Sequence, residues 1–226
     1  GETVFREVDQ PFSGLHRTRR TGARTFDVWS LRKKKYQIGE TVALSMNNCR
    51  ETAGAFFSES SDLAVAQVTV NYLHGFGWLT QMCRDVSFTG VHFHPDPQHH
   101  VSSFADCIHV CGCKGTVTIK DCSFTQAHDD AINIHGVFLR FVRRVDDHTA
   151  VFQFVHRQQG GYRAFFPGDT VRFYYRSSLQ PCGEENIVAA AEDDIDAKTC
   201  TLTFDRPLPE DIGAKFRGQQ NVVIEN

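Results

Sequence analysis

The sequence predicts an all-β protein, a right-handed parallel β-helix into which a small antiparallel β-barrel is inserted. An apolar pattern recurs along residues 46–136, no segment shows sustained helical periodicity, and a differently patterned, turn-rich stretch follows the repeats. With 226 residues, of which 41% are hydrophobic, the chain has room for one elongated domain or two small ones.

The repeat has the form apolar-x-apolar-x-x-apolar-x-apolar. Each half alternates like a β-strand, and the two intervening residues turn the chain. Its copies begin at Leu63, Val86 and Val117, so that successive copies are 23 and then 31 residues apart. One such coil cannot bury its apolar face alone, and we therefore expect the coils to stack as in a solenoid. A β-sandwich is less favoured, because Asn-Gly and Asp-Gly hairpin signals are absent between the copies.

Four segments are expected along the chain. Residues 1–45 form a strand-rich basic segment, a candidate for part of a first barrel, and residues 46–136 form the parallel coils. Residues 137–220 contain strand-like runs separated by charged or Gly/Pro turns, which is typical of an inserted barrel. Residues 221–226 alternate again and are interpreted as the start of the next coil, so the chain is expected to be a fragment.

Charge and composition exclude several classes of partner. A net charge of −3 and a pI of about 6.4 argue against nucleic acid, and no apolar run reaches the length of a membrane-spanning helix. Eight cysteines are too few for a disulfide-dense scaffold. Cys107, Cys111, Cys113 and His109 do not follow the usual zinc pattern, in which one closely spaced ligand pair is joined by a second pair at a distance, and we interpret these cysteines as small buried thiols. No metal or other cofactor is expected.

Three carboxylates carry the functional prediction. Asp106 is followed 23 and 24 residues later by Asp129 and Asp130, and 23 residues is also the spacing of the first two repeats. Positions one coil apart stack at about 4.8 Å, so Asp106 is expected beside the Asp129–Asp130 pair. Consecutive strand residues face opposite sides, and the sequence therefore predicts a bend at the pair.

Carboxylates that crowd one another suit acid/base hydrolysis, since one can remain protonated while another stays ionised. Two other interpretations remain open from spacing alone. Paired aspartates also form turns, and three carboxylates also suit a Ca²⁺ ion.

The stretch around these carboxylates resembles known families. One Asp, then an Asp-Asp pair, then His-Gly is similar to the polygalacturonases, glycoside hydrolase family 28. The closer resemblance is to glycoside hydrolase family 110, the bacterial α-1,3-galactosidases. It is carried by the motif around Asp106 and His109, by Asp129-Asp130-Ala131-Ile132-Asn133-Ile134-His135-Gly136, by Gly75-Phe76-Gly77-Trp78, and by Phe166-Pro167-Gly168-Asp169.

This resemblance implies an exo-acting, inverting, metal-independent hydrolase that releases terminal α-1,3-linked galactose. Blood-group B and linear α-galactosyl glycans are the implied substrates, and a periplasmic or secreted location follows from that substrate class. By analogy with the polygalacturonases, Asp129 is the general acid, and Asp106 and Asp130 hold and deprotonate the attacking water. The two members of the pair could exchange roles.

Six further residues are predicted to contact the substrate: His135, Asn133, Trp78, His74, Gln81 and His109. Each has a structural alternative, such as an inward amide ladder for Asn133 or core packing for Trp78. The His-rich segment 92–100 is interpreted as a stiff loop at the edge of the groove, because it holds two prolines.

Two other functions compete with the galactosidase. One is a carbohydrate-binding β-helix without catalysis. The other is a polysaccharide lyase or polygalacturonase-like enzyme. The acidic cluster has no partnered Lys or Arg, which disfavours the lyase, and the absence of an Arg-x-Lys signature after the catalytic stretch disfavours the polygalacturonase. The oligomeric state stays open.

Overall fold

The computed structural model describes residues 5–8, 15–30, 38–39, 41–44, 52–156, 159–160, 162–213, 215–216, 219–220 and 222–225. Regular secondary structure in these ranges consists of β-strands, which confirms the all-β prediction. The described part of the chain holds no helix of the length and apolar character that a membrane span requires.

The chain divides into two compact units. Unit 1 comprises Gly1–Thr80, Arg84–Val110 and Gly115–Asn133, and unit 2 comprises Gln81–Cys83, Cys111–Lys114 and Ile134–Asn226.

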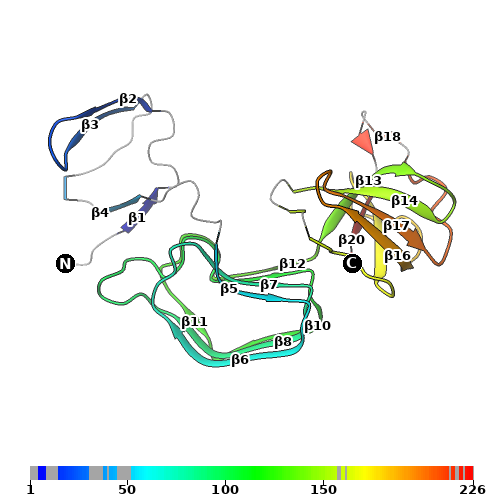
Figure 1. The fold of residues 1–226 in the computed structure, drawn as a ribbon, viewed down its shortest axis with the longest axis horizontal. Coiled ribbons are helices and arrows are strands. Elements are labelled where there is room, and N and C mark those ends of the chain that lie inside the picture. The colour runs from blue at the N-terminus through cyan, green and yellow to red at the C-terminus, as the bar shows by residue number, and fades with distance from the viewer. Residues whose placement is uncertain are drawn as a thin grey trace. The chain divides into compact units, whose positions relative to one another are not determined.

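Two sheets, most of whose residues belong to unit 1, form opposite walls of a coiled segment (Figure 1). One has the order β10-β8-β11, with β6 also paired to β8; the other has the order β12-β9-β7-β5. The strands of the first are β6 (Ser61–Val70), β8 (Arg84–Phe93), β10 (Lys114–Lys120) and β11 (Ser123–Phe124). Those of the second are β5 (Ala53–Ser58), β7 (Phe76–Gln81), β9 (Ile108–Cys111) and β12 (Ile132–His135).

The strand register confirms the repeat that was predicted from spacing. Strand β6 pairs in parallel with β8, so that Leu63 lies opposite Val86 and Val70 opposite Phe93. Strand β11 also pairs in parallel with β8, with Phe124 opposite Phe93. Apolar positions of successive copies therefore stack on one another, as expected of coils.

Left-handed residues explain the shape of each copy. The polar or glycine residue before each copy has positive φ: 55° at Asp62, 53° at Asp85 and 72° at Gly115. The second of the two intervening residues does too, as at Gln67 with 57° and Gly90 with 64°. A left-handed residue interrupts the strand alternation, so the apolar side chains on both of its sides can point inward.

The centre of unit 1 is packed with apolar side chains of the middle copy. Val86, Phe88, Val91 and Phe93 are at most 1% exposed. Trp78 from the opposite sheet packs against Phe88 and Phe93, with ring centroids 6.0 and 5.3 Å apart. This core fixes the spacing between the two walls.

Unit 2 contains a closed barrel with the order β13-β14-β17-β16-β15-β20. Its phenylalanines, among them Phe152, Phe173 and Phe204, fill the interior. The strands are β13 (Phe138–Arg144), β14 (Thr149–Phe154), β15 (Thr170–Tyr175), β16 (Asn186–Asp194), β17 (Thr199–Phe204) and β20 (Val222–Glu225).

The last strand corrects one expectation. Residues 221–226 were interpreted as the start of a further coil, but β20 closes the barrel, with Ile224 opposite both Leu139 and Phe173 in antiparallel pairs. A short alternating strand has the same pattern in a coil and in a barrel. Pairing on both sides removes the open sheet edges that β13 and β15 would otherwise present.

Six shorter strands complete the described part. Strand β1 (Phe5–Val8) pairs in parallel with β4 (Thr41–Leu44), and β2 (Leu15–Arg20) pairs antiparallel with β3 (Phe26–Ser30). Strands β18 (Lys215–Phe216) and β19 (Gln219–Gln220) form an antiparallel pair. A first barrel within residues 1–45 and the segment boundaries at 45 and 136 stay predictions.

Candidate active site

The site is built where three successive coils enter the second sheet of unit 1. Parallel bridges join Leu73 to Ser103 and Ser103 to Ala127, and so align the segments before β7, β9 and β12. Just after these bridges, the Cys107 N–H donates to the Asp130 carbonyl at 3.0 Å. Asp106 and Asp130 are therefore neighbours on adjacent coils, as their spacing predicted.

The three aspartates converge. One carboxylate oxygen from each of Asp106, Asp129 and Asp130 lies within 4.8 Å of the other two. The backbone bends at His128 and Asp129, which confirms the predicted bend and lets consecutive residues face the same place. Asp106 is buried, with 3% exposure, whereas Asp129 and Asp130 are exposed.

Two side chains hold the Asp106 carboxylate. Asn133 Nδ2 donates to Asp106 Oδ2 at 3.1 Å, and His109 Nδ1 lies 2.6 Å from the same oxygen. An amide nitrogen can only donate, so Oδ2 is an acceptor, and we assign the proton of the short contact to His109 Nδ1. Two donors on one oxygen favour the ionised carboxylate.

Phe76 completes this wall of the site. Its ring meets the His109 ring edge-on, with centroids 5.2 Å apart, and so restricts the orientation of the imidazole. Phe76 was part of the Gly75-Phe76-Gly77-Trp78 motif but was not predicted as a site residue. The bridge between Leu73 and Ser103, which are 30 residues apart, aligns Phe76 with Asp106.

Trp78 corrects a prediction. It was expected to stack on sugar, but it is only 7% exposed and packs against Phe57, Phe88 and Phe93. The alternation of β7 turns this side chain inward, so its ring belongs to the core.

The other predicted contacts lie in different places. His74 is exposed, with its Nε2 3.3 Å from the Thr52 hydroxyl. Gln81 and His135 belong to unit 2. His135 Nδ1 forms a hydrogen bond with the Gly136 carbonyl oxygen at 2.7 Å. Substrate contact by these three residues stays a prediction.

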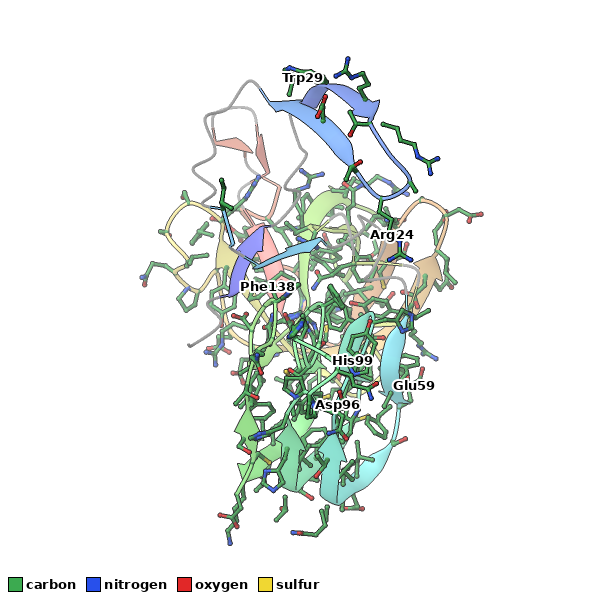
Figure 2. All side chains as sticks on the ribbon, turned by 90° about the vertical axis from the view of Figure 1, so that its left-hand side faces the viewer. Arg24, Trp29, Glu59, Asp96, His99 and Phe138 are labelled. Carbon is green, nitrogen blue, oxygen red and sulfur yellow. The ribbon has the colours of Figure 1, made fainter. Side chains whose placement is uncertain are left out.

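The His-rich loop carries a fixed aromatic cluster. Asp96 binds the His99 ring at 2.8 Å, and the two side chains lie next to one another (Figure 2). The backbone N–H of Gln98 lowers the pKa of Asp96, and His99 lowers it further. Tyr72 stacks on His99 with ring centroids 4.1 Å apart. A role of this loop at the edge of a groove stays a prediction.

The predicted buried thiols are present. Cys107 and Cys111 are buried, and Cys113 is partly buried. Burial raises the pKa of Cys107 to about 11 and that of Cys113 to about 11, which keeps both thiols protonated near neutral pH.

Two kinds of chemistry fit the carboxylate cluster. A buried Asp106 that accepts hydrogen bonds, beside two exposed carboxyl groups, can divide with them the roles of base and acid. The same oxygens could also surround a hard cation such as Ca²⁺.

The chain is similar to one family model and to several curated proteins. Residues 149–215 match the family model described as GLAA-B beta-barrel domain II. The chain is 34% identical to alpha-1,3-galactosidase B of Bacteroides fragilis over 145 residues, which are 62% of this chain and 24% of that protein. It is 34% identical to alpha-1,3-galactosidase A of Streptomyces avermitilis over 186 residues, 78% of this chain and 29% of that protein. It is 31% identical to alpha-1,3-galactosidase A of Bacteroides thetaiotaomicron over 197 residues, 86% of this chain and 34% of that protein.

The chain thus spans about a quarter to a third of the length of these relatives.

Proposed function

We propose that this chain carries the catalytic carboxylates of an α-1,3-galactosidase of glycoside hydrolase family 110. The observation that supports the proposal most strongly is the convergence of Asp106, Asp129 and Asp130 within 4.8 Å on adjacent coils. The similarity to several proteins named alpha-1,3-galactosidase supplies the substrate class. The parallel stacking of the coils supports a β-helix, whose right-handedness we also propose.

In the proposed reaction, water attacks the anomeric carbon of a terminal galactose. Asp106 is the base, because its Oδ2 already accepts from His109 and Asn133 and so favours the ionised form. Asp106 and Asp130 both hold the water by accepting its hydrogen bonds, and Asp106 takes the proton that the water loses on attack. Asp129 gives its proton to the glycosidic oxygen as the bond from that oxygen to the anomeric carbon breaks.

The stereochemical outcome rests on the family resemblance. Acid and base of inverting enzymes usually stand about 6.5–9.5 Å apart, whereas the nearest oxygens of this cluster are closer. We propose inversion, with exo action on blood-group B and linear α-galactosyl glycans at a periplasmic or secreted location. The first-formed anomer is the direct measure of this part of the proposal.

The test is galactose release from the B trisaccharide and from linear Gal-α-1,3-Gal. It is made with this chain and with a longer polypeptide that contains it, each with and without EDTA. The variant is Asp130→Asn, and the matched control is Asp62→Asn, an exposed turn residue with φ 55° where asparagine fits equally well.

We expect release that EDTA does not affect, that Asp130→Asn abolishes and that Asp62→Asn leaves intact. Proton NMR of the first product should show the β-anomer of galactose. Glycan binding without release by either polypeptide would overturn the proposal in favour of a non-catalytic carbohydrate-binding β-helix. Loss of activity with EDTA would instead favour a bound cation among the carboxylates.

A further inference from the structure

A second cluster of functional groups lies on the first sheet of unit 1. Strand β8 buries Val91 and Phe93, at 0% exposure each, so His92 and His94 both point away from the core. They are two residues apart in the sequence, and their ring centroids are 6.1 Å apart. None of the chemistry proposed above uses these two imidazoles.

Both rings aim at one point. His92 Nδ1 lies 2.7 Å from the Ser123 hydroxyl oxygen, and His94 Nε2 lies 2.7 Å from the same oxygen. A hydroxyl has one proton and two lone pairs, so it can donate to at most one ring, and at least one ring donates to it. The Ser123 oxygen therefore marks a position on which two ring nitrogens converge.

The backbone around this point is held in place. Ser123 is the direct partner of His92 in the parallel pairing of β11 with β8. The His94 N–H donates to the Val70 carbonyl at 3.0 Å, and Asn71 Nδ2 donates to the His94 carbonyl at 3.3 Å. The two imidazoles thus start from fixed Cα positions, and only side-chain rotation is needed to alter their separation.

We propose that His92 and His94 form a binding site for a divalent transition-metal ion. Neutral imidazole is a good ligand for Cu²⁺, Ni²⁺ and Zn²⁺, and Cu²⁺ binds most tightly of the three to a given nitrogen site. Imidazole nitrogens bind such ions at about 2.0–2.1 Å, so each ring moves slightly inward from its distance to Ser123. Water fills the remaining positions, and the Ser123 hydroxyl turns away from the ion.

This site differs in chemistry from the aspartate cluster. Carboxylate oxygens prefer hard ions such as Ca²⁺ and Mg²⁺, whereas the paired imidazoles prefer ions late in the first transition series. The proposal does not depend on the galactosidase function.

The test measures Cu²⁺ binding to the tag-free chain. Isothermal titration calorimetry gives the affinity, and electron paramagnetic resonance reports the ligands. The variants are His92→Gln and His94→Gln, and the matched control is His156→Gln, which removes an exposed histidine from unit 2. Circular dichroism verifies that each variant is folded. Ser123→Ala tests the position of the hydroxyl.

We expect wild type and His156→Gln to bind one tight Cu²⁺ with a two-nitrogen hyperfine pattern. Loss of either ligand should weaken binding by more than the roughly 10- to 100-fold that loss of an outer-shell partner costs. Ser123→Ala should bind at least as tightly, because the rings no longer give up hydrogen bonds to the hydroxyl. Equal affinity and spectrum in wild type, His92→Gln and His94→Gln would overturn the proposal, and so would weaker binding in Ser123→Ala.

Discussion

The contact between Asn133 and Asp106 allows a quantitative prediction about the proposed base. Replacing Asn133 by leucine keeps a side chain of similar length but removes the amide that donates to Asp106 Oδ2 at 3.1 Å. His109 then remains as a donor at 2.6 Å. A hydrogen bond to a charged group contributes about 1.5–3 kcal/mol, and one pH unit corresponds to about 1.4 kcal/mol.

The acidic limb of kcat/KM should therefore move to higher pH by roughly one to two units in Asn133→Leu, because the base is protonated more easily. The assay is galactose release against pH with the active polypeptide, and Asn71→Leu is a control that removes an exposed amide from another coil. An equal loss of kcat/KM at every pH, with the limb unmoved, would refute the reasoning. Asn133 would then contact the substrate, as the sequence alone predicted.

Three further predictions concern stability and reactivity. Phe93→Ala should lower the free energy of unfolding by about 3–5 kcal/mol, since the ring is 0% exposed; a loss below 1 kcal/mol in urea denaturation would contradict the packing. Gly77→Ala should destabilise unit 1 and impair galactose release, because a Cβ there would overlap the carbonyl oxygens of Asp106 and Cys107; an unchanged melting temperature would argue against this close approach. Alkylation of Cys107 in the folded chain should accelerate about tenfold for each pH unit between pH 8 and 10, because its pKa is about 11; mass spectrometry showing rapid modification at pH 7 would disprove that burial.

The sequence was sufficient to predict the stacking of the coils and the meeting of the aspartates. Both depend on sequence spacing, and the register between Leu63 and Val86 equals the spacing of the repeats. The turn residue before each copy was also visible, since Asp62 and Asp85 are polar residues before apolar runs. Their left-handed conformation follows from the need to interrupt alternation.

Other features could not be predicted from spacing. The apolar ring of Trp78 is suited both to stacking on a sugar and to packing in the core. The inward direction of its side chain on β7 shows that it packs in the core. The roles of His109 and Asn133 depend on the distances from their ring and amide nitrogens to Asp106. Residue spacing does not determine these distances. The place of β20 depends on barrel closure, which brings together residues far apart in sequence.

Closure of the barrel by β20 has a consequence for the order of folding. Neighbouring coils of unit 1 join residues 23 to 31 positions apart, so each coil can dock as soon as the next one has been synthesised. The barrel instead joins Phe138 to Glu225, so β13, which can pair early with β14, must wait for nearly ninety further residues before its second partner exists. Nascent chains that end before β20 should therefore hold ordered coils next to an open, protease-sensitive sheet.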